Sequence, residues 1–326
     1  MEATQRLESG PAATPIVLRP MGLGEILDVA FTLYRKNFLL LIGIGAVINV
    51  PVVLVQILAA VVTMPVDFNV FSRNPTSFSN YSGLAIFYLV LMVTGVIAAI
   101  ANIFEFGAMA VAISEKYLGR TVTLRQAYGR TLRHWFRLIV ASILLGLIAL
   151  IFIAPIFLFL GVTFFSSTID RQSASALAAI GSLCMCLGMI VLLPVWIYLM
   201  IRFSFYIQAI VLENLGSRAG LARSWRLVKN SFLRVFGILM MLGILVYILT
   251  MVPSTLIQFA VMALAPTSLT LTTVASSVST VLVSLLIEPI QIAVLTLLYY
   301  DLRIRKEGFD LQFQMQLTDS ASTGNA

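Results

Sequence analysis

Charged residues are scarce in this chain. Asp, Glu, Lys and Arg make up 11% of its 326 residues, apolar residues make up 60%, and the mean hydropathy is +1.01. Soluble globular domains carry roughly a quarter charged residues. The composition therefore excludes an ordinary soluble enzyme or binding domain and indicates a chain embedded in lipid.

Histidine and cysteine are nearly absent as well. His134 is the only histidine, and the two cysteines, Cys184 and Cys186, stand in an apolar run. A tetrahedral zinc site needs four ligands, so we expect no metal site and interpret both thiols as packing residues. The sequence also has no H-E-x-x-H motif, no glycine-rich loop after a strand and no Ser/His/Asp set. We therefore predict no catalytic residue, no cofactor and no enzyme activity.

Long apolar runs dominate what is present. A helix that crosses a membrane needs about 20 mostly apolar residues. Six segments meet this length: residues 39–64, 83–114, 138–165, 175–212, 235–264 and 275–300. We therefore predict an all-α polytopic membrane protein with six transmembrane helices.

A pattern of leucine and aromatic residues recurs at a constant spacing. The three occurrences are Leu27, Phe31 and Phe38, then Leu124, Tyr128 and Trp135, then Leu221, Trp225 and Phe232. The spacing is 97 residues, since 128 − 31 = 97 and 225 − 128 = 97. Each occurrence is followed by two of the long apolar runs. The sequence thus predicts three parallel repeats, each made of an interfacial amphipathic helix and two spans.

The short helix of each repeat is expected at residues 22–37, 122–137 and 218–234, and Thr123 and Gln126 have the spacing of a capping box. A basic helix with aromatic residues on one face is typical of the headgroup plane. The alternative is a helix that only sets the entry angle of the next span. The predicted headgroup contacts are Arg125, Arg130, Arg133, Arg223, Arg226 and Lys229, and the predicted interfacial anchors are Phe31, Tyr128, Trp135 and Trp225.

Basic residues predict the orientation. Of the 21 Lys and Arg residues, all but Arg73 and Arg171 fall on the side of the short helices and the two termini, and 21 − 2 = 19. The positive-inside bias therefore places both termini in the cytoplasm. We attribute the net charge of +7 to this topology and to anionic headgroups as partners, and we expect no nucleic acid. Other membrane proteins are further candidate partners.

The expected domain organisation is simple. Residues 1–20 are polar and proline-containing and predict a disordered cytoplasmic N-terminus, and residues 309–326 predict a flexible cytoplasmic tail. Between them lies a single transmembrane domain, residues 21–308, with repeat units at about 22–120, 121–217 and 218–308.

Three charged residues stand inside the predicted spans. Glu105 and Arg202 occupy equivalent repeat positions, and Glu288 follows the pattern more loosely. Charges at membrane depth normally face partners or water. We therefore predict an intramembrane polar cluster in which Arg202 binds Glu105 or Glu288. The cluster is either a structural bridge between repeat units or a site for a proton, an ion or a headgroup.

Three segments carry a family resemblance. Residues 19–28, continuing to 34–38, resemble the opening of the glycerophosphoryl diester phosphodiesterase membrane-domain family, residues 224–232 resemble its internal segment, and residues 297–308 resemble its closing motif. The resemblance covers about residues 19–312 and implies a six-span protein of the bacterial plasma membrane, of unknown activity. Some relatives add a phosphodiesterase barrel with a carboxylate and histidine metal site, which a single histidine does not supply.

Two functions remain open from the sequence. The first is a non-catalytic membrane protein, a scaffold or accessory factor of the bacterial cell envelope, that contacts anionic lipid through its basic helices. The second is a transporter or channel that uses Glu105, Arg202 and Glu288. A continuous polar cavity that reaches these three residues would favour transport, and a dry packed centre would favour the scaffold.

Overall fold

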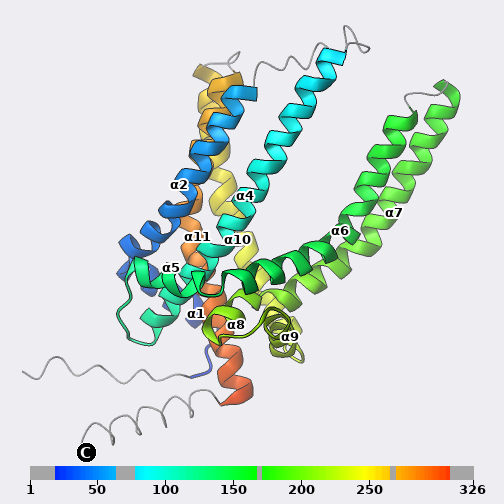
Figure 1. Ribbon diagram of the computed structural model, residues 1–326. Helices are drawn as coiled ribbons and strands as arrows, with labels where there is room; N and C mark the ends of the chain where they lie inside the picture. The colour runs from blue at the N-terminus through cyan, green and yellow to red at the C-terminus, as the bar shows by residue number, and fades with distance from the viewer. Residues whose placement is uncertain (1–18, 64–77, 167–170, 265–268, 309–326) are drawn as a thin grey trace, which may run out of the picture.

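The computed structural model describes residues 19–63, 78–166, 171–264 and 269–308, and every element in these ranges is a helix (Figure 1). The long helices are α2 (Phe38–Thr63), α4 (Phe78–Tyr117), α6 (Trp135–Ser166), α7 (Arg171–Phe203), α10 (Phe232–Leu264) and α11 (Leu269–Glu307). The short helices are α1 (Leu23–Lys36), α5 (Leu124–Leu132), α8 (Tyr206–Leu212) and α9 (Ser217–Val228). The predicted disordered N-terminus lies outside the described residues except for residues 19 and 20. The predicted flexible tail and Arg73 also lie outside the described residues.

The prediction of six spans is confirmed. Six segments of the described residues are long and apolar enough to cross a membrane: Phe38–Ala59, Tyr88–Tyr117, Trp135–Phe157, Ala179–Leu212, Phe232–Leu264 and Val274–Glu307. The fold is therefore that of a multi-pass helical membrane protein. A short helix precedes a pair of long helices three times along the chain, in the order that the repeat predicts. A symmetric relation between these units stays a prediction.

The fourth span departs from the prediction, because it is not one continuous helix. It breaks after Phe203 and resumes as α8. The buried Ser224 of α9 explains the break, since its hydroxyl accepts a hydrogen bond from the Phe205 amide (3.1 Å) and donates one to the Arg202 carbonyl (2.8 Å). Backbone groups freed from the helix thus keep partners. These hydrogen bonds come from Ser224 on a separate helix, so the sequence around residues 202–205 does not predict the break.

Helix α11 forms the centre of the molecule. It packs against α1, α2, α4, α9 and α10, and 56% of its most apolar window is buried, against 6% for α6 and for α7. Helices α6 and α7 run side by side and lean away from the other four long helices (Figure 1). The buried core therefore concentrates where α11 meets α4 and the short helices, with Ile292, Leu297 and Tyr299 fully covered.

The short helices α1, α5, α8 and α9 lie at one end of the molecule, together with the last turns of α11 (Figure 1). We call these four helices and residues 297–307 the basal layer. The capping box predicted for the second short helix is confirmed. The Thr123 amide donates to the Gln126 side chain (3.0 Å), and the Gln126 amide donates to the Thr123 hydroxyl (3.4 Å). Two orphan amides at the start of α5 are thereby satisfied.

Candidate functional site at the basal layer

A pocket opens in the basal layer beside the end of α4. Its volume is about 470 Å³, and its walls come from α4, α5, α8, α11 and the segments after α4 and α8. The polar lining residues are Ser114, Glu115, Arg120, Arg130, Glu213, Tyr300 and Arg303. Valine and leucine side chains complete the wall. Cavities of this size hold small organic molecules.

The end of α4 determines where Arg120 lies. Gly119 has φ of 71°, its amide donates to the Lys116 carbonyl (3.2 Å), and the Arg120 amide donates to the Glu115 carbonyl (2.8 Å). These two bonds form a Schellman motif, which reverses the chain after the helix and needs a left-handed residue. Arg120 is therefore held against the last turn of α4. Its guanidinium lies 3.9 Å from Glu115, which also pairs with Arg130 at 2.5 Å.

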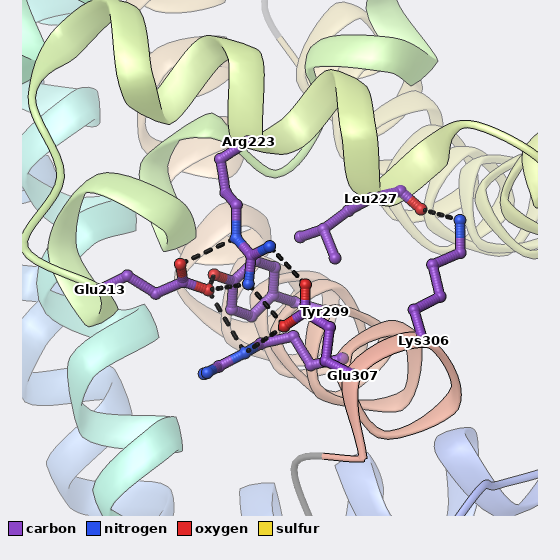
Figure 2. A network of polar contacts seen from close by, with 7 residues as sticks. Glu213, Arg223, Leu227, Tyr299, Lys306 and Glu307 are labelled. Carbon is purple, nitrogen blue, oxygen red and sulfur yellow. Dashed lines mark hydrogen bonds and ion pairs between the residues drawn. The ribbon is translucent and has the colours of Figure 1, made fainter.

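Next to the pocket lies a network of charges in which three separate segments meet (Figure 2). Arg223 of α9 donates to both carboxylate oxygens of Glu213 (2.8 and 3.0 Å). It also donates to both carboxylate oxygens of Glu307, a residue of α11, one of them at 2.6 Å. Arg303 lies 3.3 Å from Glu213 and 3.6 Å from Glu307, and the Tyr299 hydroxyl donates to Glu213. Hydrogen bonds to Glu307, and then to Glu213, raise the pKa of the Arg223 guanidinium against the effect of burial. Two arginines thus balance two glutamates that are mostly covered.

Lys306 and Asp301 tie the closing segment, residues 297–308, to other parts of the molecule. The Lys306 ammonium donates to the Leu227 carbonyl (2.8 Å) and to the Lys229 carbonyl, where it caps the end of α9. Asp301 is fully buried, accepts from the Met21 amide (2.8 Å), and pairs with Arg234 and Arg305, each at 3.0 Å. A cation at a helix C-terminus is favourable. The closing segment therefore joins α9, α10 and the residues just before α1.

The single histidine, His134, joins two segments of the basal region through its ring nitrogens. His134 is buried, and its ring nitrogens lie 2.9 Å from the Arg130 carbonyl and 2.7 Å from the Asn214 side-chain oxygen. Arg137 also donates to that oxygen (2.7 Å). These bonds join the corner between α5 and α6 to the segment after α8. Among the described residues, no group of three His, Cys, Asp or Glu side chains is placed to hold a metal ion.

The predicted headgroup contacts divide into two groups. Arg125, Arg133, Arg226 and Lys229 have exposed side chains, and Arg130 is 54% exposed although it pairs with Glu115. The prediction for Arg223 is wrong, because its side chain is only 16% exposed and its donors bind the two glutamates. A short helix must bury one face, and Arg223 shares that face with Ser224 and Leu227.

The predicted interfacial anchors divide in the same way. Phe31 is 42% exposed and Trp135, the first residue of α6, is 53% exposed. Tyr128 instead turns toward α2 and donates its hydroxyl to the Ile44 carbonyl (2.6 Å). Burial, and then the nearby Glu105 carboxyl, raise the pKa of Tyr128. Trp225 packs against Tyr198 and Phe203, so the expectation that every anchor faces lipid is wrong for these two residues.

The intramembrane cluster is only partly as predicted. Glu105 is fully buried, accepts two hydrogen bonds from the Asn49 amide (2.8 and 3.0 Å), and lies within hydrogen-bonding reach of Glu288. One carboxyl oxygen of Glu288 is buried without a partner. The structure thus brings the two carboxyl groups together from α4 and α11, with Asn49 of α2 as the donor.

Arg202 does not join them, and the predicted bridge is wrong. Its guanidinium donates to the Tyr198 hydroxyl (3.0 and 2.7 Å) and to the Trp225 carbonyl (3.2 Å), and it stacks 4.6 Å from the Trp225 ring centre. A residue near the end of a span reaches toward the polar boundary with a long side chain. There the face of a tryptophan ring is a favourable neighbour for the guanidinium. The 97-residue spacing predicts the depth of Arg202 in the membrane, but it does not predict the direction in which the side chain points.

Both cysteines also depart from the prediction. Cys184 and Cys186 are exposed on α7, not packed inside the bundle. Helix α7 packs along α6, but only 6% of the most apolar window of the fourth span is buried, so most of its apolar surface is exposed. An apolar run in the sequence does not distinguish a residue that faces protein from one that faces lipid.

The residues that build the pocket and the network were largely missed from the sequence. Glu115, Glu213 and Asp301 are single carboxylates at the ends of apolar runs, where no periodic pattern marks them. The one signal in the sequence is the closing segment at residues 297–308, which carries a family resemblance. It contributes Tyr299, Tyr300, Asp301, Arg303 and Glu307 to these contacts.

A family model described as "Domain of unknown function (DUF7847)" matches residues 21–302. No curated protein matches, and no solved structure matches.

Proposed function

We propose a function for this chain, which belongs to the family described as Domain of unknown function (DUF7847), from the surface of its basal layer. The chain is a non-catalytic integral membrane protein that contacts anionic lipid headgroups and acts as a scaffold or accessory factor of the cell envelope. The resemblance to the glycerophosphoryl diester phosphodiesterase membrane domain, carried by residues 297–308, supports placing it in a bacterial plasma membrane.

One observation carries this proposal. Arg125, Arg133 and Arg226 belong to the short helices of the basal layer or their ends and have exposed side chains, and among the described residues none of them forms an ion pair. Exposed apolar side chains accompany them, with Phe136 at 63% and Trp135 at 53%. A surface with both features suits the boundary between headgroups and acyl chains.

The test measures the anionic lipid that remains with the protein. Arg125, Arg133 and Arg226 are replaced together by Gln, and the protein is extracted from native membranes in polymer nanodiscs. Each removed charge weakens the attraction by about 1 kcal/mol, so the ratio of anionic to zwitterionic lipid around the variant falls several-fold. A matched triple Lys variant keeps the charge and keeps the ratio. An unchanged ratio in the Gln variant would show that these arginines act on topology alone.

Orientation forms part of the proposal. The basal layer faces the cytoplasm, because 19 of the 21 basic residues fall on the side of the short helices and the two termini. Reporter fusions after Gly119 and Gly216 report cytoplasm, and fusions near Asn80 and Ser173 report the outside. A reversal at any of the four points contradicts this orientation.

Transport is the second candidate, and one observation favours it. The carboxyl groups of Glu105 and Glu288 meet inside the bundle, and a buried oxygen of Glu288 has no hydrogen-bond partner. Intramembrane carboxyl groups of this kind form proton relays in pumps and transporters. Proton flux into liposomes that hold the protein, abolished by Glu105→Gln, would favour this function. Equal flux with wild-type protein, with Glu105→Gln and with empty liposomes would exclude it.

A further inference from the structure

We propose that the basal pocket binds one phosphate-bearing ligand through Arg120, Arg130 and Arg303. This site goes beyond the proposed function, which requires only diffuse contact between exposed arginines and headgroups. The three guanidinium groups line one cavity of about 470 Å³ and come from three segments: the turn after α4, helix α5 and helix α11. A fold that gathers three arginines around one cavity provides several donors for a single anion.

The charge of the lining favours an anion. Three arginines and two glutamates line the pocket, so the formal balance is 3 − 2 = +1. Glu213 opposes an anion only weakly, because Arg223, which is outside the lining, holds both of its oxygens at 2.8 and 3.0 Å. Glu115 competes directly with a ligand for Arg120 and Arg130, whereas Glu213 and Glu307 lie 3.3 and 3.6 Å from Arg303 and are shared with Arg223.

Arg120 and Arg130 have hydrogen-bond donors available. Arg130 uses one terminal nitrogen for Glu115 (2.5 Å), and Arg120 approaches Glu115 only to 3.9 Å, which is too long for a hydrogen bond. In the described part of the chain, neither guanidinium has another acceptor. Since each guanidinium carries five N–H donors, most donors of Arg120 and Arg130 are available to a ligand. The side chains are 59% and 54% exposed, so a ligand can reach them from outside.

The shape and the remaining lining indicate the class of ligand. Phosphate alone would occupy a small part of the cavity, so the ligand is a phosphate monoester or diester with an organic group attached. The hydroxyls of Ser114 and Tyr300, 2.6 Å apart, provide polar contacts for that group, and valine and leucine side chains provide apolar contacts. Such a ligand is either a lipid headgroup or a water-soluble phosphate ester, and the two share the same anion.

The experiment separates these two sources. The full chain in lipid-free detergent is titrated in one arm with inorganic phosphate and in the other with dioctanoyl phosphatidic acid, and heat is recorded by calorimetry. Saturable binding of one equivalent is expected in at least one arm. Binding in both arms indicates a site open to soluble phosphate esters, and binding of the lipid alone indicates a headgroup site. No saturable binding in either arm would overturn the proposal.

Matched variants identify the pocket. The pair Arg120→Gln and Arg130→Gln weakens binding by at least about tenfold, because charge-assisted hydrogen bonds are lost. The pair Arg35→Gln and Lys36→Gln removes the same charge from exposed positions at the end of α1, outside the pocket and outside the lipid-contact surface, and leaves binding unchanged. Equal losses in the two pairs would show general electrostatic attraction and overturn the site. That outcome would leave the lipid-enrichment test of the proposed function intact.

Glu115 gives a test with the opposite sign. Glu115→Gln removes the competing charge and keeps a side chain of nearly the same shape, so phosphate binding becomes tighter. Unchanged or weaker binding would overturn the proposed competition between Glu115 and the ligand for the same arginines. Thermal unfolding in detergent shows for each variant that the protein is folded.

Discussion

Gly119 is the residue on which the position of Arg120 depends. Its φ of 71° lies in the left-handed region, where a side chain clashes with the backbone. Gly119→Ala therefore lowers the free energy of unfolding by about 1 kcal/mol and loosens the turn that holds Arg120 against Glu115. The loss is measured as a lower thermal unfolding midpoint in detergent.

Gly129 serves as the control for this change. It lies inside α5, and a Cβ atom added there would meet nothing within 4 Å. Alanine is a better helix former than glycine by about 1 kcal/mol, so Gly129→Ala keeps or raises the midpoint. A midpoint that falls equally in both variants would show that the left-handed turn is not what makes Gly119 special.

For single residues, the sequence predicts contacts within a helix turn better than contacts between helices. Thr123 and Gln126 were predicted correctly because their hydrogen bonds need only a fixed spacing along one helix. Arg202 was predicted wrongly because its partner depends on how α7 is rotated against its neighbours. The partners that it has, Tyr198 and the Trp225 carbonyl, include a residue 23 positions further along the chain.

Helices α4 and α5 approach each other closely at Gly107. A Cβ atom on Gly107 would lie 2.5 Å from the Thr131 methyl carbon and 3.4 Å from its hydroxyl oxygen. Gly107→Ala therefore pushes α5 away from α4 and costs about 2 kcal/mol, a typical value for overpacking. The change is measured as a lower thermal midpoint.

The second substitution at this contact restores the fit. Thr131→Ser removes the methyl carbon and keeps the hydroxyl, which donates to the Ala127 carbonyl (3.1 Å). Added to Gly107→Ala, it recovers most of the lost stability, and alone it changes stability little. Additive losses in the double variant would contradict the contact between α4 and α5 as described.

Among the elements, the long helices could be predicted and the interruption of the fourth could not. Residues 201–205 contain no glycine or proline, the usual signals of a helix end. The break is stabilised by Ser224, which is 19 residues beyond Phe205 and bonds across from α9. The closeness of α8 and α9 also depends on Gly220, where a Cβ atom would lie 2.4 Å from Ile210. Such tertiary causes leave no local pattern.

For the whole molecule, hydropathy predicted how many spans exist but not which of them is central. All six spans have a mean hydropathy between 2.1 and 2.9, yet 56% of the α11 window is buried and only 6% of the α6 window. Lipid and protein interior are similarly apolar, so transfer free energy does not distinguish them. The pocket was beyond prediction for a related reason, since it forms only where the ends of α4, α5, α8 and α11 meet.

We propose that the basal layer lies in one headgroup region while the long helices cross the bilayer. The chain has three tryptophans, and two of them report depth. Trp135 is the first residue of α6, directly after helix α5 of the basal layer, and is 53% exposed. Trp196 lies seven residues before the end of α7, about 10 Å along the helix. Two variants that each keep one of these tryptophans are reconstituted with lipids brominated near the headgroup or deep in the acyl chain.

The measurement is the quenching of tryptophan fluorescence by each lipid. Trp135 is expected to be quenched more by bromine near the headgroup, and Trp196 more by bromine deep in the chain. Stronger quenching of Trp135 by the deep label, or no quenching of it by either label, would contradict the placement of the basal layer at the membrane surface.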